Sequence, residues 1–231
     1  FVGAYDINRD SLENLSGELP KDYCQIKRLD VANKDDYQSA INSFSDATSG
    51  RLDLLFNNAG IGKGGYFDEQ SFEDILSIVN VNLLGVLHGI YLASKLLRNT
   101  ENSLCFTTSS SSATYGMPGL AVYSATKHAV KGLTEALSIE MSRYGVRVAD
   151  TLPGLIDTPL IPEGWRASAP SQGMFRLISA SEVAQVVWGA YHDTTGRLHW
   201  YIPEEIAELD KASANDPEGT RKKLSSLNGF E

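Results

Sequence analysis

The chain has 231 residues, a length typical of one domain, and its 42% hydrophobic content is too high for a disordered chain. A net charge of −9 argues against a nucleic-acid-binding surface and favours a small-molecule enzyme or a soluble partner protein. The two cysteines cannot form a disulfide framework, and no uninterrupted apolar run approaches the ~18 residues of a membrane span, so we expect a cytoplasmic protein with reduced thiols.

Short apolar runs alternate with longer helical patterns, which predicts a parallel sheet covered by helices. The expected strands are residues 1–5, 23–29, 52–56, 104–108, 146–152 and 199–202. The expected helices are residues 10–19, 34–48, 72–98, 123–143 and 181–191. Residues 159–177 are expected to be irregular, and the tail 203–231 to be polar and helical in part. No shift in composition suggests a linker, so residues 1–231 are predicted to form a single domain.

The first residues of the chain already have the pattern of a strand, with no initiator Met and no signal or transit peptide before them. A natural chain rarely begins within a strand. We therefore expect a segment ahead of Phe1 that this sequence does not contain.

The strongest chemical signal is the pair Tyr123 and Lys127, which lie four residues apart at the start of a predicted helix and so share a face. A free phenol titrates near pH ~10, and a nearby ammonium lowers that pKa by stabilising the phenolate. The pair therefore predicts a phenol that can act as an acid or a base. Tyr and Lys at this spacing are more often a solvated surface pair, so the surrounding sequence must decide whether the pair is functional.

Polar residues also follow two predicted strands, at the sheet edge where α/β proteins bind ligands. Serines 109–112 follow one strand, and Asn57-Asn58-Ala59-Gly60 follow another. Asn82 lies inside a long apolar helix, where Asn is unfavourable and needs hydrogen-bond partners. Each feature also has a structural interpretation, as a flexible loop, a polar turn or a buried polar contact.

Together these elements resemble the short-chain dehydrogenase/reductase family, from residue 1 to about residue 203. The matching pieces are Asp6, Asp30-Val31, Asn57-Asn58-Ala59-Gly60, Asn82, the serine stretch, Tyr123-x-x-x-Lys127 and Pro153-Gly154-x-x-x-Thr158. The resemblance implies a Rossmann-like α/β fold with a doubly wound parallel sheet. It also implies an oxidoreductase that transfers a hydride between a nicotinamide cofactor and an alcohol or ketone.

The resemblance assigns four catalytic residues. Tyr123 would protonate a carbonyl or deprotonate an alcohol, and Lys127 would lower the Tyr123 pKa and bind the nicotinamide ribose. The family's catalytic serine lies thirteen residues before the tyrosine, which selects Ser110. Ser110 would hold the substrate oxygen, and Asn82 would anchor a water that relays protons to Lys127.

The resemblance also assigns the residues that bind the cofactor. Asp6 would accept hydrogen bonds from the adenosine ribose and repel a 2′-phosphate, which favours NAD over NADP, although Arg9 could soften this preference. The adenine, adenosine ribose and nicotinamide would contact Asp30, Val31, Asn58, Ala59, Gly60, Tyr123, Lys127, Pro153, Gly154, the backbone of Leu155 or Ile156, and Thr158.

One part of the family pattern is not in the sequence. The family's first strand and glycine-rich turn, which cradles the pyrophosphate, should precede Phe1 by about one helix. The glycines of 60–65 follow the wrong strand and have the wrong spacing to replace that turn. We expect them to form a flexible loop beside the active-site cleft.

Weaker signals concern the substrate, metals and assembly. Residues 159–177 would form the substrate lid, where Trp165, Met174 and Phe175 could line an apolar pocket and Arg166 or Arg176 could meet an anionic substrate. The four histidines and two cysteines show no metal-ligand spacing, so no metal is expected. The two long helices correspond to the family's usual subunit interface, which implies a homodimer or homotetramer.

Three functions remain open from the sequence. The leading one is an NAD-dependent alcohol dehydrogenase or carbonyl reductase acting on a small or medium apolar substrate. The others are an NADPH-dependent 3-oxoacyl reductase, which Asp6 disfavours, and a non-catalytic nucleotide-sensing or scaffolding protein of the same fold. The set Asn82, Ser110, Tyr123 and Lys127 argues against the last.

Overall fold

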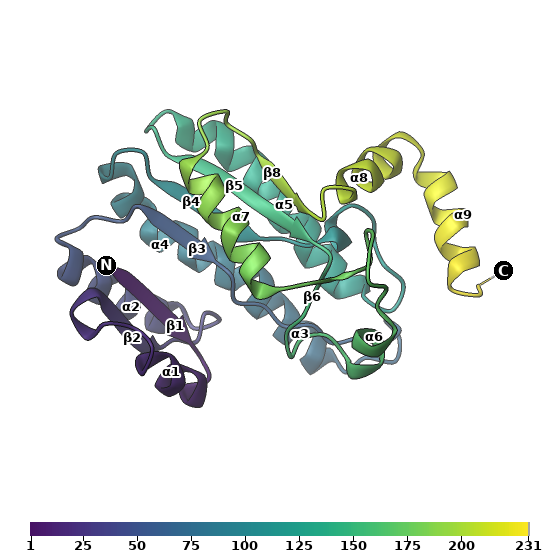
Figure 1. Ribbon diagram of the computed structural model, residues 1–231, viewed down its shortest axis with the longest axis horizontal. Coiled ribbons are helices and arrows are strands. Elements are labelled where there is room, and N and C mark those ends of the chain that lie inside the picture. The colour runs from purple at the N-terminus through teal and green to yellow at the C-terminus, as the bar shows by residue number, and fades with distance from the viewer. Residues whose placement is uncertain (231) are drawn as a thin grey trace.

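A computed structural model of the chain describes residues 1–230, apart from the side chain of Lys21, and shows helices packed on parallel strands (Figure 1). The longer strands are β1 (Val2–Asp6), β2 (Cys24–Arg28), β3 (Leu54–Asn57), β4 (Leu104–Thr108), β5 (Arg147–Pro153) and β8 (His199–Ile202). The main helices are α1 (Arg9–Ser16), α2 (Lys34–Thr48), α3 (Phe72–Val79), α4 (Gly85–Asn99), α5 (Ala121–Ser142) and α7 (Ala180–His192). Every strand pair that hydrogen-bonds is parallel, which confirms the predicted fold class.

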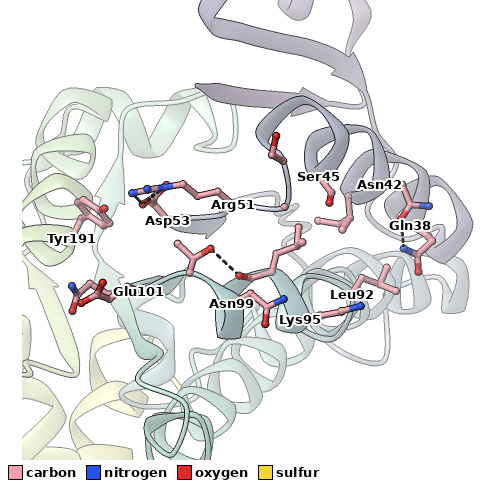
Figure 2. A pocket seen from close by; sticks show the side chains of 16 residues that line it. Gln38, Asn42, Ser45, Arg51, Asp53, Leu92, Lys95, Asn99, Glu101 and Tyr191 are labelled. Carbon is pink, nitrogen blue, oxygen red and sulfur yellow. Dashed lines mark hydrogen bonds and ion pairs between the residues drawn. The ribbon is translucent and has the colours of Figure 1, made fainter.

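The sheet is divided into two hydrogen-bonded groups. β1 pairs with β2, and β3, β4, β5 and β8 form a second group in that order. Among the described residues, no hydrogen-bonded ladder joins β1 to β3. The resemblance places the family's first strand between these two groups. A hollow of about 830 Å³ lies next to the start of β3 and is lined by residues of α2 and α4 and by Tyr191 of α7. Figure 2 shows the side chains that line it.

The second group of strands has a hydrophobic core on each face. Leu55, Cys105 and Val148 point toward α4 and α5, where they pack against Leu97 and Met141. On the opposite face Phe106 and Ala149 pack against Val187 of α7, which crosses in front of the sheet in Figure 1. Successive side chains along a strand point to opposite faces of the sheet, so these contacts show on which face each remaining strand residue lies.

A single long helical run crosses behind the sheet. A π-helical turn, η2 (Asn80–Leu84), joins α3 to α4. By length and composition alone, the run Phe72–Asn99 is long and apolar enough to cross a membrane. The search for uninterrupted apolar residues did not detect this run, because Asn, Gly and His interrupt it. In this fold Ile78, Ala93 and Leu97 of the run are fully buried, and 28% of its most apolar 18-residue stretch is buried within the protein.

The segment 159–177 is more regular than expected. It contains a short helix, α6 (Glu163–Ser168). It is also tied to the core by a two-residue ladder between β6 (Leu155–Ile156) and β7 (Leu177–Ile178). The prediction of an irregular segment was therefore wrong for α6. The sequence did not predict this six-residue helix, because it contains Gly164 and exposed polar residues around Trp165.

The tail after Pro203 forms two helices, α8 (Ile206–Asn215) and α9 (Pro217–Leu227), which extend past one end of the sheet (Figure 1). Ile206 is fully buried, and the Ser213 hydroxyl donates a hydrogen bond to the Thr114 carbonyl at 2.7 Å. The tail is therefore attached to the connection between β4 and α5.

Candidate active site

The first turns of α5 carry Tyr123 and Lys127 on the face that meets β4. The helix begins at Ala121, directly after the turn that Pro118 and Gly119 form. The Lys127 ammonium lies 5.6 Å from the centroid of the Tyr123 ring. The predicted shared face of this pair is therefore observed.

Ser110 lies opposite this pair, where the chain leaves β4. Its backbone is extended, its side chain is buried, and its hydroxyl accepts a hydrogen bond from the Ser112 N–H at 3.1 Å. The Ser110 hydroxyl lies close enough to Tyr123 to lower the pKa of the phenol. Its role in holding the substrate oxygen stays a prediction.

Lys127 is almost fully buried, with 5% of its surface exposed. Its ammonium donates a hydrogen bond to the Thr108 carbonyl at 2.7 Å, and the Ser109 hydroxyl donates to the Lys127 carbonyl at 3.1 Å. Burial disfavours the charged form and lowers the pKa of Lys127 to about 8, while the charge of Asp150 opposes this shift. At neutral pH the ammonium form still predominates.

The pKa of Tyr123 differs from the expectation. Burial raises the pKa of this phenol, and the hydrogen bond with Ser110 only partly offsets the effect. Desolvation of the buried phenolate is the dominant cause, because burial disfavours the charged form. The Lys127 ammonium also donates to Thr108 rather than to the phenol.

Asn82 occupies the π-helical turn between α3 and α4. The Gly85 N–H bonds to the Asn80 carbonyl five residues back, and such turns occur often at functional sites. The fully buried Asn82 amide accepts from the Ile61 N–H at 2.8 Å and donates to the Ile61 carbonyl at 2.9 Å. The amide thus holds the loop after β3, and the water-anchoring role that the resemblance assigned to Asn82 stays a prediction.

The residues assigned to the adenosine lie at the carboxyl ends of β1 and β2. Asp6 is exposed, and its carboxylate accepts a hydrogen bond from the Asn8 N–H at 2.8 Å. The Asp30 carboxylate accepts from the Ala32 N–H at 3.0 Å. Val31 packs against Gly85 so closely that a Cβ there would lie 2.8 Å from a Val31 methyl carbon.

The other assigned residues line the same edge of the sheet. The Asn58 side chain accepts a hydrogen bond from the Thr108 hydroxyl at 2.9 Å, which joins the ends of β3 and β4. Pro153 ends β5, and the Gly154 N–H donates to the Ile202 carbonyl at 2.8 Å. The Thr158 hydroxyl contacts the Ile156 carbonyl at 3.4 Å.

Gly60 provides a test of whether a cofactor fits this edge. A Cβ added to Gly60 would lie 3.5 Å from the Asn82 oxygen and 3.8 Å from the Lys127 nitrogen. The backbone at Ala59 and Gly60 therefore leaves open a space that borders the Lys127 ammonium. A ribose hydroxyl suits this donor and this space.

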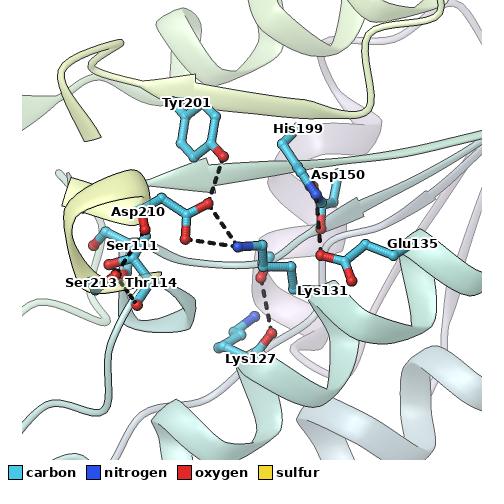
Figure 3. A network of polar contacts seen from close by, with 11 residues as sticks. Ser111, Thr114, Lys127, Lys131, Glu135, Asp150, His199, Tyr201, Asp210 and Ser213 are labelled. Atoms are coloured by element: carbon cyan, nitrogen blue, oxygen red, sulfur yellow. Dashed lines mark hydrogen bonds and ion pairs between the residues drawn. The ribbon is translucent and has the colours of Figure 1, made fainter. Parts of the chain in front are cut away.

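Sequence reasoning missed a group of polar residues behind α5. Asp150 on β5 bonds to His199 on β8, and Lys131 on α5 binds Asp210 on α8 (Figure 3). The one available signal was the spacing of Lys127, Lys131 and Glu135, which places three charged side chains along one helix face.

Known proteins resemble the chain along most of its length. The family model described as short chain dehydrogenase matches residues 1–167. The 3-oxoacyl-(acyl-carrier-protein) reductase FabG of Thermotoga maritima is 31% identical over 216 residues, covering 90% of this chain and 85% of that protein. Cyclohexanol dehydrogenase of an Acinetobacter species is 31% identical over 186 residues, covering 79% and 74%.

Solved structures show the same arrangement. Levodione reductase superposes with a TM-score of 0.76 at 25% identity, covering 87% of this chain and 85% of that one. A 3-ketoacyl-(acyl-carrier-protein) reductase from Brucella melitensis, complexed with NADH, also has a TM-score of 0.76, at 26% identity and the same coverage.

Proposed function

The chain belongs to the short-chain dehydrogenase family, and from this premise we propose which residues carry its reaction and which substrates it takes. It is an oxidoreductase of CH–OH and carbonyl groups, in a family that uses NAD(H) or NADP(H). The residues, the choice of cofactor, the substrate and the assembly are our proposals.

The convergence of Ser110, Tyr123 and Lys127 carries the proposed mechanism. The Tyr123 phenol transfers a proton to the carbonyl oxygen of a ketone, or in the reverse direction its phenolate takes one from the hydroxyl of an alcohol. The Ser110 hydroxyl, which lies near the phenol, holds the same oxygen in place. The Lys127 ammonium beside the ring stabilises the phenolate.

The cofactor supplies or accepts the hydride when it is bound. We propose that Lys127 and the backbone at Gly60 hold its nicotinamide ribose. Pro153, Gly154, Ile156 and Thr158 would border the nicotinamide, and Asp30, Val31, Asn58 and Ala59 the adenosine. These residues lie at the carboxyl ends of parallel strands, where α/β sheets bind such ligands.

Asp6 supports NAD as the cofactor. Its exposed carboxylate can accept hydrogen bonds from both adenosine ribose hydroxyls, whereas a 2′-phosphate would meet a like charge. Arg28 is the register partner of Asp6 on β2, but it is paired with Asp36 at 3.2 Å. Arg28 is therefore already engaged by a carboxylate and does not favour a phosphate.

We propose a small or medium apolar alcohol or ketone as the substrate. Gly62 lies next to Leu160 of the lid and to the Tyr123 ring. A Cβ added to Gly62 would be 3.3 Å from a Leu160 methyl carbon and 4.0 Å from a Tyr123 ring carbon. The lid arginines are already paired, Arg166 with Asp157 and Arg176 with Glu182. An apolar wall with neutralised arginines suits an uncharged substrate.

A second candidate is a 3-oxoacyl reductase. The observation in its favour is the 31% identity to the Thermotoga maritima enzyme across 90% of this chain. The two candidates differ in the substrate that enters beneath the lid and share the same chemistry at Tyr123.

We also propose a homodimer or homotetramer in the cytoplasm. The outer faces of α4 and α5 expose apolar side chains, among them Tyr91 at 74% and Ile139 at 76%. Exposed large apolar side chains on both helices support an interface between subunits at these faces. Light scattering on the purified protein tests the assembly.

The experiment that tests the proposal compares cofactors and substrates in one sample. The protein is titrated with NADH and NADPH by nicotinamide fluorescence, and then assayed with cyclohexanone and with acetoacetyl-coenzyme A. Tighter NADH binding and faster reduction of cyclohexanone support the first candidate. NADPH preference with faster reduction of the thioester supports the second, and cofactor binding without turnover of any substrate supports a non-catalytic protein.

A further inference from the structure

Two glycines of the loop after β3 face the pair Tyr123 and Lys127. A Cβ added to Gly60 would lie 3.8 Å from the Lys127 nitrogen, and a Cβ added to Gly62 would lie 4.0 Å from a ring carbon of Tyr123. Neither glycine has a positive φ, so a residue with a side chain could adopt the same backbone conformation. The missing side chains therefore matter for the space that they leave beside the pair.

Gly62 is also the one of the two that borders the lid. The same added Cβ would lie 3.3 Å from a methyl carbon of Leu160, in the segment 159–177. Leu160 is 43% exposed, so its side chain is not packed into the core. The Tyr123 ring and the Leu160 side chain thus border the position that a side chain at residue 62 would fill.

The loop is held in place on both sides of Gly62. Before it, the buried Asn82 amide binds the N–H and the carbonyl of Ile61, at 2.8 and 2.9 Å. After it, the Gly65 N–H donates a hydrogen bond to the Gly119 carbonyl at 2.9 Å. Because the loop is tied at both points, it cannot move freely away from an added side chain. Such a side chain has to displace the lid residue instead.

The backbone beside Leu160 is held as well. The Ile161 N–H donates a hydrogen bond to the Thr158 carbonyl at 3.1 Å, and the Arg166 guanidinium donates to the same carbonyl at 2.9 Å. A group added at residue 62 can therefore turn the half-exposed Leu160 side chain more easily than it can shift the chain that carries it. The residues at positions 62 and 160 together set the room between the loop and the lid.

We propose that Gly62 is a specificity-determining residue, whose bare backbone admits a cyclic substituent of the substrate between the loop after β3 and Leu160. This inference rests on the proposed function, because it places the carbonyl oxygen of the substrate at the Tyr123 phenol. The substituents of that carbonyl extend past the phenol, and one of them lies toward Gly62. A methyl group at residue 62 fills part of this room and so disfavours a bulky ketone more than a small one.

The experiment compares two uncharged ketones of different size, acetone and cyclohexanone, with the full chain and NADH. The measured quantity is kcat/KM for cyclohexanone divided by kcat/KM for acetone. Gly62→Ala should lower this ratio about tenfold, the usual effect of one methyl group in an apolar pocket. The Kd for NADH should stay within about twofold, because Gly62 faces the lid and Gly60 faces Lys127. Equal losses for both ketones overturn the inference.

Gly64→Ala is the matched control in the same loop. It adds the same methyl group at an exposed position, where its nearest neighbour would be the Gly119 carbonyl oxygen at 3.9 Å. Gly64→Ala should therefore change the ratio by less than about twofold. If Gly64→Ala lowers the ratio as much as Gly62→Ala, the effect comes from stiffening of the loop and the inference is wrong.

Leu160→Ala tests the same space from the opposite side. It removes the lid side chain that faces Gly62, so it should raise the ratio about threefold. Combined with Gly62→Ala, it should bring the ratio back to within about threefold of the wild-type value, because the new methyl group then has room. Leu160→Ala decides the question if Gly62→Ala does not fold, and an unchanged ratio in this variant overturns the inference.

Binding without turnover separates this inference from the proposed function. Oxidised NAD has no hydride to give, so each ketone binds beside it without reacting, and ligand-observed NMR measures the two Kd values. If the wild-type protein reduces no ketone but Gly62→Ala weakens the binding of cyclohexanone alone, the proposed function fails and the inference holds. If turnover depends on Tyr123 and the ratio is the same in Gly62→Ala, the inference fails alone. If neither ketone binds or reacts, both fail.

Discussion

The side chain of Asn82 forms two hydrogen bonds with the backbone of Ile61, one to its N–H at 2.8 Å and one to its carbonyl at 2.9 Å. A helix interior is thereby joined to the loop that follows β3. Asn82 lies within the π-helical turn, and such turns occur frequently at functional sites.

Replacing Asn82 with leucine leaves the Ile61 N–H and carbonyl without their partners. We expect Asn82→Leu to lower the free energy of unfolding by about 2–4 kcal/mol. Urea denaturation followed by circular dichroism measures this change. Asn99→Ala, at the exposed end of α4, serves as the control and should change it by less than about 0.5 kcal/mol. A similar loss in both variants would contradict a specific role for the Ile61 contact.

Tyr123→Phe removes the proton donor and leaves the ring in place. We expect kcat to fall by about 10²–10⁴-fold, the usual contribution of general acid–base catalysis. The Kd for NADH should stay within about twofold, because the phenol contributes to proton transfer far more than to binding. Stopped-flow reduction and fluorescence titration measure the two quantities. Wild-type turnover in this variant would refute the mechanism.

Asp6→Ala removes the carboxylate that opposes a 2′-phosphate. We expect the ratio of the NADPH to the NADH dissociation constant to fall about tenfold, because the like-charge repulsion is lost. The matched control is Asp10→Ala in the first turn of α1, which changes the net charge equally. If both variants shift the ratio alike, the preference comes from overall charge, and Asp6 is not the selector.

The lowered pKa of Lys127 predicts how stability depends on pH. The folded chain releases this proton near pH 8 and the unfolded chain at a higher pH, so the unfolded state binds more protons between these values. Stability therefore rises with pH through that window and carries a penalty on the order of 3 kcal/mol below it. Lys127→Met should remove this rise. Thermal unfolding of both proteins between about pH 7.5 and 9.5 measures the difference, and parallel curves would contradict the assignment.

Much of the site could be predicted from the sequence because it depends on local spacing. Tyr123 and Lys127 share a face through helical periodicity alone. Ser110 and Asn58 follow strands that are apolar enough to identify. Asn82 stood out because its polarity conflicts with the helix around it.

The rest depends on contacts that spacing does not encode. Asp150 and His199 are 49 residues apart, and only the register of β5 with β8 brings them together. The π-helical turn that contains Asn82 has no characteristic amino-acid composition, so the sequence could not predict it. The pKa of Tyr123 depends above all on burial, which cannot be read from a list of residues.

The lid is fastened at both ends by ion pairs on the surface. Arg166 contacts Asp157 at one end, and Arg176 contacts Glu182 in the first turn of α7 at the other. Exposed pairs of this kind contribute about 0–1 kcal/mol each, and dissolved salt screens them. Rising ionic strength therefore loosens the attachment of this segment to α7 and to the residues after β6.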